Sequence, residues 1–187
     1  MIRIGIIVGS TRPGRKAETV AEWVRDLAVK RGDAEYELVD LRDFPLPHLD
    51  EALPAAYGQY EHPHTRAWSD RIASFDGYVF VTPEYNSSTT GVLKNAIDFL
   101  FAEWADKPAG LVSYGVDGGA RAAEHLRQML GRLKVADVSA QVSLSLHTDF
   151  EGFTDFKPAA HREEAVTTML DQVVSWGTAL RPLRAAA

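Results

Sequence analysis

The chain alternates between short apolar segments typical of buried strands and longer segments with helical spacing. Residues 2–8 form an almost unbroken apolar run, which indicates a strand covered on both faces. Four further strands are predicted at residues 35–41, 76–82, 108–115 and 136–144. Helices are predicted at residues 16–32, 66–75, 91–104, 119–133 and 162–183. Strands that alternate with helices form parallel sheets through right-handed connections, so the sequence predicts a doubly wound α/β fold.

Composition favours one domain in the cytoplasm. With 187 residues and 45% hydrophobic content, the chain can bury one sizeable core, so we expect a single domain over residues 1–187. The formal net charge of -6 argues against nucleic acid or an anionic membrane as a partner. The N-terminus meets charges and turn residues too soon for a signal peptide, and no segment reaches about 18 consecutive apolar residues.

Cysteine is absent from the sequence. This absence excludes disulfides, thiolate metal sites and thiol nucleophiles. Any redox chemistry must therefore come from a cofactor.

The loop after the first predicted strand is suited to an anion. Gly9 and Gly14 relax its backbone, and the N-terminus of the next helix faces it. Its hydroxyls and guanidinium groups come from Ser10, Thr11, Arg12 and Arg15. Together these donors predict a phosphate site.

Two familiar phosphate motifs do not match this loop. A P-loop needs Lys and then Ser or Thr after its second glycine, whereas Gly14 is followed by Arg15 and Lys16. The dinucleotide fingerprint G-x-G-x-x-G does not fit the spacing of Gly5, Gly9 and Gly14. A P-loop nucleotidase and a Rossmann NAD site are thus both disfavoured.

The loops after the third and fourth strands suit a flat, polar ligand. The third strand is followed by Tyr85, which offers a flat face, and by neutral hydrogen-bonding groups on Asn86 and the two serines after it. Tyr114 stands beside a glycine-rich turn whose backbone N–H groups can approach a ligand closely. Ligands of doubly wound sheets bind beyond the carboxyl ends of the strands, so all three loops are expected to meet at one site.

Three segments together resemble the NADPH-dependent FMN reductase family. They are GSTRPGR at 9–15, PEYNSSTTGVLKNAIDF at 83–99 and SYGVDGGARAAEHLR at 113–127, and the resemblance runs from Met1 to about Gln141. The family consists of flavodoxin-like proteins that include quinone, azo-compound and chromate reductases. The resemblance implies a five-stranded parallel sheet of order 2-1-3-4-5 with helices on both faces, bound FMN, and NADPH or NADH as electron donor.

The resemblance also implies which residues contact FMN. The phosphate would be bound by Ser10, Thr11, Arg12 and Arg15. The ribityl chain and ring would lie along Pro83, Glu84, Tyr85 and Asn86. The other side of the flavin would be closed by Ser113, Tyr114, Gly115, Gly118 and Gly119. Relatives often have Ser and Asn where this chain has Arg15 and Ala17, and we expect the additional arginine to offset that loss.

The expected activity is electron transfer from NAD(P)H through FMN to a small acceptor by a ping-pong mechanism. The acceptor class is a quinone, a flavin, an azo compound or a metal oxyanion. Hydride transfer to a flavin needs no general acid or base, so no catalytic side chain and no metal are predicted. His62 and His64 are interpreted as surface residues. A flavodoxin-type electron carrier without hydride transfer and a cofactor-free binding module remain alternative hypotheses, and NAD(P)H turnover separates them.

An oligomer is expected from the predicted helix at 91–104. This helix is apolar on more than one side, with Leu93, Ile97, Phe99 and Trp104 among its residues, and so it needs a cover. Members of the resembled family commonly form dimers or tetramers, which implies a homodimer or homotetramer here. The segment 42–65 contains four prolines and predicts a surface excursion, whose role the sequence leaves open.

Overall fold

The computed structural model describes residues 1–185 and is built around a parallel sheet of five strands. The strands are β1 (Arg3–Val8), β2 (Glu35–Asp40), β3 (Gly77–Pro83), β4 (Pro108–Gly115) and β5 (Ala136–Ser145). Their order is β2-β1-β3-β4-β5, and every neighbouring pair is parallel. This arrangement confirms the predicted flavodoxin-like sheet, with each strand end within one residue of its prediction.

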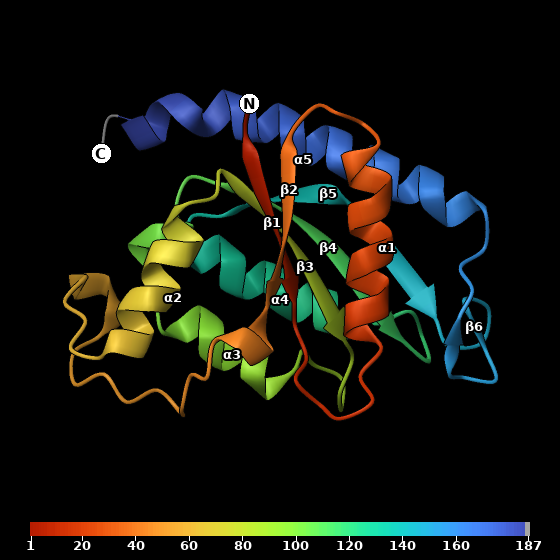
Figure 1. Ribbon diagram of the computed structural model, residues 1–187, viewed down its shortest axis with the longest axis horizontal. Helices are drawn as coiled ribbons and strands as arrows, with labels where there is room; N and C mark the ends of the chain where they lie inside the picture. Colours follow the sequence, from red (N-terminus) through yellow and green to blue (C-terminus); the bar gives the residue numbers. More distant parts are fainter. Residues whose placement is uncertain (186–187) are drawn as a thin grey trace.

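Helices cover both faces of the sheet (Figure 1). One face carries α1 (Ala17–Val29) and α5 (His161–Ala185), and the other carries α2 (Pro63–Ala73), α3 (Gly91–Asp98) and α4 (Ala120–Arg132). Successive strand side chains point to opposite faces, so Ile6 packs with the first helix pair and Ile7 with the other three. Among residues 1–185, no helix has both the length and the apolar character that crossing a bilayer requires.

The predicted helix at 91–104 is wrong in its second half. The α-helix α3 ends at Asp98, and after a break at Phe101 the chain forms only a 3₁₀ turn at Ala102–Trp104. Tertiary packing accounts for the break, because the Trp104 ring packs against those of Tyr78 and Phe80 on β3, with centroids 5.0 and 5.9 Å away. The indole N–H of Trp104 also donates to the carbonyl of Ile97 at 3.1 Å. Phe99 and Trp104 are buried in the core of this chain. Much of the apolar surface that predicted a partner subunit is therefore covered from within.

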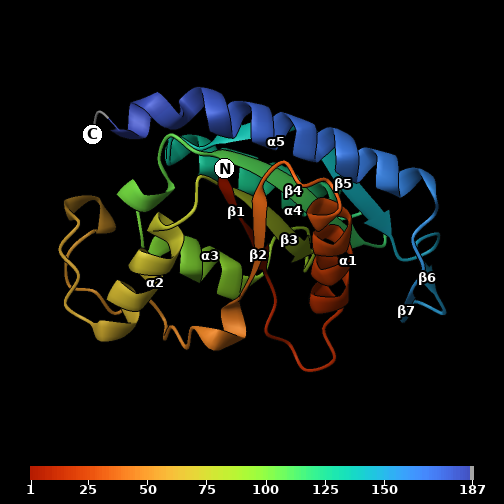
Figure 2. The same ribbon diagram turned by 45° about the horizontal axis from the view of Figure 1, so that its top comes forward.

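Three other helices differ by more than one residue from their predicted limits. Helix α1 ends at Val29 rather than at residue 32. Helix α2 starts at Pro63 rather than at residue 66, because proline fits the first turn of a helix. Helix α5 continues past Pro182 to Ala185. The stretch before α5, where no helix or strand was predicted, contains a two-stranded antiparallel hairpin of β6 (Phe150–Glu151) and β7 (Asp155–Phe156), seen at the edge of the molecule in Figure 2.

The proline-rich segment 42–65 packs on its own chain. Two 3₁₀ turns lie at its start and middle, Leu41–Asp43 and Ala55–Tyr57. The side-chain amide of Asn95 on α3 donates to the carbonyl of Pro47 at 2.7 Å and accepts from the backbone N–H of Leu49 at 3.1 Å. The segment therefore covers α3.

The two histidines at the end of this segment lie side by side. The rings of His62 and His64 stack with their centroids 5.1 Å apart, and Nε2 of His64 lies 3.0 Å from a carboxylate oxygen of Asp50. Within residues 1–185, no group of three or more His, Asp or Glu side chains is placed to hold a metal ion.

A buried lysine lies at the amino edge of the sheet. Lys107 is 5% exposed, and its ammonium donates to the Tyr78 hydroxyl at 3.0 Å and to the carbonyls of Ile72 and Ala73 at the end of α2. Burial lowers the pKa of Lys107 to about 8, with a further contribution from the positive charge of Arg184. The cluster stands at the opposite edge from the predicted ligand loops.

Candidate functional site

The loops after β1, β3 and β4, which we call the first, second and third loops, meet around a hollow of about 260 Å³. We call this space the loop hollow. Its lining includes seven of the residues expected to bind the cofactor: Arg12, Arg15, Pro83, Glu84, Tyr85, Tyr114 and Gly115. Four residues outside the set expected to contact the cofactor also line it: Gly14, Lys16, Leu146 and Phe153. The carboxyl edge of the sheet thus brings together the segments that the doubly wound topology predicts.

The first loop is pressed against β3 at Gly9. The backbone N–H of Gly9 donates to the carbonyl of Val81 at 2.8 Å, and a Cβ at Gly9 would lie 2.6 Å from that same oxygen. Thr90 closes the loop from the other side, since its hydroxyl donates to the carbonyl of Gly9 at 2.6 Å. Only glycine fits here, and these two hydrogen bonds fix the first loop against β3 and α3.

Tyr114 reaches from β4 to the start of α1. Burial raises the pKa of Tyr114 well above its usual value, and the nearby backbone N–H groups of Ala17 and Lys16 lower it by less. The tyrosine therefore stays a neutral phenol at physiological pH. Its hydroxyl marks the end of the hollow where an anion would meet the N-terminus of α1.

Arg15 is engaged with groups of the protein itself. Its guanidinium binds both carboxylate oxygens of Asp40, donates to the carbonyl of Ser10 at 2.7 Å and donates to Glu18 at 3.1 Å. Its side chain is almost fully buried, and its Nε has no hydrogen-bond partner within residues 1–185. The pairing ties the first loop to the end of β2, so direct contact of Arg15 with a phosphate stays a prediction.

The pairing with Arg15 lowers the pKa of Asp40. Burial alone would raise the pKa of its carboxyl, but hydrogen bonds from Arg15 and from the backbone N–H of Arg42 outweigh burial and lower it. The guanidinium of Arg42 also donates to the carbonyl of Arg12 at 3.0 Å. The Arg12 side chain itself is exposed on the rim of the hollow.

The second loop turns tightly after Tyr85. Asn86 and Ser87 both have positive φ, at 49° and 64°, and Tyr85 and Ser88 exchange backbone hydrogen bonds of 2.9 and 3.1 Å across them. This pattern is typical of a type I′ turn, in which asparagine is favoured. The Tyr85 hydroxyl lies 3.3 Å from Oγ of Ser10, which joins the second loop to the first.

The carboxylate of Glu84 binds Arg121 in the first turn of α4. It accepts from the backbone N–H of Arg121 at 3.0 Å and from the guanidinium of the same residue at 2.9 Å. A carboxylate at this place stabilises the N-terminus of a helix. The side chain thereby fixes the second loop against the third.

The third loop depends on two left-handed glycines. Gly118 and Gly119 have φ of 73° and 72°, and a Cβ at Gly119 would lie 2.7 Å from the backbone nitrogen of Tyr114. The hydroxyl of Ser113 donates to the carbonyl of Gly118 at 2.8 Å. Ser113, Gly118 and Gly119 therefore fix the conformation of the third loop without lining the hollow. Gly115 does line it.

Three further predicted residues lie beside the loop hollow. Ser10 is buried behind Tyr85, Thr11 is half-buried in the first loop, and Asn86 lines a shallow depression shared with Arg12 and Glu84. Of the missed residues, Leu146 and Phe153 follow β5. The rule that ligands bind beyond the carboxyl ends of strands could have pointed to them, because β5 ends at the same edge.

Comparison with known proteins identifies the family of this chain. The family model for NADPH-dependent FMN reductase matches residues 2–149. The chain belongs to this family. It is 42% identical over 149 residues to an NAD(P)H-dependent FMN reductase of Schizosaccharomyces pombe, covering 79% of this chain and 74% of that protein. It is 36% identical over 140 residues to a quinone reductase of Escherichia coli, with 69% of each chain covered.

The structural comparison gives the same fold. The flavoenzyme NAD(P)H:(acceptor) oxidoreductase FerB of Paracoccus denitrificans superposes with a TM-score of 0.75 at 25% identity, covering 95% of this chain and 98% of that one. These findings confirm the expected family, its oxidoreductase class, and the family's dependence on FMN and NAD(P)H.

The residues of the loop hollow fit the FMN of this family. At one end, Arg12 and the N-terminus of α1 supply the guanidinium and backbone donors that a phosphate monoester needs, and the buried Ser10 hydroxyl lies beside the hollow, 3.3 Å from that of Tyr85. At the other end, Tyr85 and Gly115 form walls suited to a flat ring. A Cβ on Gly115 would approach Cβ of Glu84 to 3.2 Å, so glycine allows the second and third loops to lie this close.

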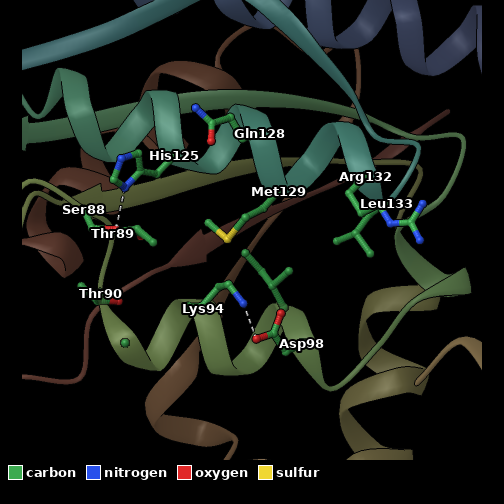
Figure 3. A pocket seen from close by; sticks show the side chains of 12 residues that line it. Ser88, Thr89, Thr90, Lys94, Asp98, His125, Gln128, Met129, Arg132 and Leu133 are labelled. Atoms are coloured by element: carbon green, nitrogen blue, oxygen red, sulfur yellow. Dashed lines mark hydrogen bonds and ion pairs between the residues drawn. The ribbon is translucent and has the colours of Figure 1, made fainter. Parts of the chain in front are cut away.

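A larger hollow of about 700 Å³ lies between α3 and α4, and we call it the helix hollow (Figure 3). Residues 88–90, which continue the second loop, form one end of it, where Nδ1 of His125 lies 2.9 Å from Oγ of Ser88. Its apolar lining consists of Ile97, Met129 and Leu133. The first loop does not reach it, so it lacks the anion-binding end of the loop hollow.

Proposed function

We propose that this chain is an FMN-dependent oxidoreductase that passes electrons from NAD(P)H to a small acceptor, namely a quinone, a flavin, an azo compound or a metal oxyanion. The observation that carries this proposal is the meeting of an anion-binding loop with the flat walls at Tyr85 and Gly115, in a member of the NADPH-dependent FMN reductase family. When bound, FMN accepts a hydride and releases electrons to a second substrate.

The chain binds and orients the cofactor. Ser10, Thr11, Arg12 and the N-terminus of α1 hold the phosphate, while Arg15 holds the first loop through Asp40. Residues 83–86 would flank the ribityl chain and ring, and the backbone N–H groups beside Gly115, the third-loop residue that lines the hollow, would donate to the far edge of the ring. Those donors stabilise negative charge on the ring system. No side chain of the site acts as a general acid or base in this scheme.

The first test is anaerobic mixing of the FMN-reconstituted protein with NADPH and then with NADH, followed by visible absorption. Rapid bleaching is the expected result. Bound flavin that stays yellow would support the alternative, an electron carrier without hydride transfer, and failure to bind FMN would refute the assignment. The ping-pong scheme predicts parallel double-reciprocal lines at several acceptor concentrations, and intersecting lines would contradict it.

The phosphate assignment has its own test. Arg12→Gln removes the exposed guanidinium of the first loop, and a lost charge-assisted hydrogen bond of about 1.5–3 kcal/mol weakens FMN binding roughly 10- to 150-fold. Riboflavin, which lacks the phosphate, should bind equally to wild type and variant. Equal loss for both ligands would show that Arg12 does not act on the phosphate.

The assembly proposed is a homodimer or homotetramer that meets through the helix hollow. The apolar lining at Met129 and its closeness to Ser88, in the second loop, support this surface. Sedimentation should show an oligomer for wild type and a monomer for Met129→Glu, while Trp176→Glu on α5 should leave the assembly unchanged. A monomeric wild type would refute the proposal.

The proposal treats residues 1–187 as one flavodoxin-like, FMN-binding domain in the cytoplasm, where reduced nicotinamides are available. Residues 186 and 187 lie outside the described part of the chain.

A further inference from the structure

The β6–β7 hairpin stands next to the loop hollow and is anchored by one buried carboxylate. Asp149 is 0% exposed, and its side chain accepts from the backbone N–H groups of Ser145 and Ala159 at 2.9 and 3.2 Å. Arg162, at the start of α5, donates to both of its oxygens at 3.1 Å. The carbonyl of Asp149 accepts from the backbone N–H of Lys157 at 2.9 Å. Both ends of the hairpin are thus fixed to the fold.

The root of the hairpin packs on the proposed cofactor site. Phe150 is buried, with its ring centroid 5.9 Å from that of Tyr114 and 5.1 Å from that of Phe156. Phe156 in turn meets Trp23 of α1 edge to face at 5.4 Å. The hairpin is therefore a rigid element with a defined position relative to Tyr114.

The tip of the hairpin holds a phenylalanine in a strained backbone conformation. Gly152 and Phe153 have φ of 57° and 60°, and the backbone N–H of Thr154 donates to the carbonyl of Glu151 at 3.0 Å across them. Two successive positive φ values in such a turn favour glycine or asparagine, and a bulky residue there costs free energy. Strain of this kind persists where the side chain is needed at a site.

The ring of Phe153 lies at the loop hollow and not in the core. Its side chain lines the hollow beside Leu146, the residue is 53% exposed, and its ring meets that of His147 edge to face at 5.0 Å. The family model ends at residue 149, so the hairpin lies beyond the segment that it matches. The hairpin thus brings an exposed, apolar, flat surface to the rim of the site.

We propose that Phe153, presented by the β6–β7 hairpin, is a specificity-determining residue that contacts the ring of a planar aromatic electron acceptor. This inference rests on the proposed oxidoreductase function and adds the acceptor class: flat quinones and similar ring systems over compact inorganic anions. Aromatic contact supplies the selectivity, because a flat ring gains from stacking or edge contact with phenylalanine and a compact anion does not.

The test compares Phe153→Gly and Phe153→Tyr with the wild-type holoenzyme, using 1,4-naphthoquinone and ferricyanide as acceptors. Phe153→Gly should raise the KM for the quinone about three- to tenfold, the range of one lost aromatic contact, and leave the KM for ferricyanide unchanged. Phe153→Tyr keeps the ring and should restore the quinone KM. Trp176→Ala, which removes a 50% exposed aromatic side chain on α5, should change neither KM.

Two readouts do not depend on turnover. Glycine relieves the strained turn, so Phe153→Gly should raise the Tm by about 2–4 °C, whereas a ring that served only packing would lower it on removal. The Kd for FMN, followed by flavin fluorescence, should change less than the KM for the quinone, because the exposed Phe153 ring lies at the rim of the hollow. A weakened FMN Kd with an unchanged quinone KM would overturn the proposal, because Phe153 would then be part of the cofactor wall.

Failure of this inference differs from failure of the proposed function. If the wild type binds FMN and is bleached by NADPH but all variants treat both acceptors alike, the inference is refuted and the proposed function stands. If the wild type binds no FMN, the proposed function is refuted, and the inference falls with it.

Discussion

Gly119 gives the sharpest test of how the third loop is built. Its φ of 72° lies in the left-handed region, where a side chain costs about 1–2 kcal/mol. An added Cβ would also lie 2.7 Å from the backbone nitrogen of Tyr114 and 2.8 Å from Cβ of Ser113, both on the buried strand β4. Since neither strand atom can move freely, overpacking adds about 1–3 kcal/mol. We therefore expect Gly119→Ala to lower the free energy of unfolding by about 2–5 kcal/mol.

Helix α4 begins directly after Gly119, and a glycine near its other end offers a matched control. Gly131 lies in α4, and a Cβ there would have no neighbouring atom within 4 Å. Gly131→Ala should raise stability by up to about 1 kcal/mol, because alanine favours the helix. The two substitutions are chemically identical, so their opposite signs isolate the backbone conformation and the crowding at Gly119.

Urea unfolding measures both effects. With a slope of about 2 kcal/mol per molar urea, the midpoint should fall by roughly 1–2.5 M for Gly119→Ala and rise by up to about 0.5 M for Gly131→Ala. FMN binding should weaken in the first variant, since the loop at 115–119 must move, and stay unchanged in the second. A Gly119→Ala protein as stable as wild type, with normal FMN affinity, would refute the account of this loop.

Three further outcomes follow from buried charges. Between about pH 8 and pH 10.5, the free energy of unfolding should rise by about 2–3 kcal/mol more in wild type than in Lys107→Met. The reason is that folding lowers the pKa of Lys107, so the unfolded chain keeps its proton to a higher pH. Parallel pH profiles of the two proteins would contradict this. Asp40 has a lowered pKa when folded, so its contribution is present above the unfolded value of 3.8 and is lost as pH falls through the folded value. Asp40→Asn should therefore be less acid-sensitive than wild type in denaturation at pH 2–5, and less stable at pH 7 because Arg15 loses its charged partner. Asp149→Ala should cost about 3–5 kcal/mol in urea unfolding, since it leaves Arg162 without its buried partner; a loss below 1 kcal/mol would show that the hairpin anchor is unimportant.

The sheet could be predicted from sequence because its signal is local. Each strand is a short apolar run with β-branched residues, and the turn residues on either side limit its ends. The helix predicted at 91–104 failed for the opposite reason. Its apolar pattern continues past Asp98, but Trp104 gains a hydrogen bond to Ile97 and a place in the core only if the helix stops. The packing of Trp104 against Tyr78 and Phe80 of β3 is a contact between distant parts of the chain, and the local pattern does not show it.

The candidate site could likewise be predicted where its signal is local and was missed where it depends on contacts between distant residues. The three loops were predicted because their glycines, hydroxyls and cations are unusual in sequence, and the topology requires them to meet. The pairing of Arg15 with Asp40 was missed, since the two residues lie on different elements and the sequence alone does not match a cation with its anion. Phe153 was missed because its segment carries no periodicity, and only the folded hairpin brings it to the hollow.

The anchoring of the hairpin by Asp149 bears on how this fold can be altered. The residues between Asp149 and Lys157 leave and re-enter the fold at one point, where the carbonyl of Asp149 accepts from the backbone N–H of Lys157. Because the two ends are clamped, changing the length of the intervening segment costs only the weak logarithmic entropy of loop closure. The tip can thus be exchanged, as antibody loops are, without disturbing the sheet, and libraries confined to residues 151–155 offer a route to reductases with new acceptor preferences.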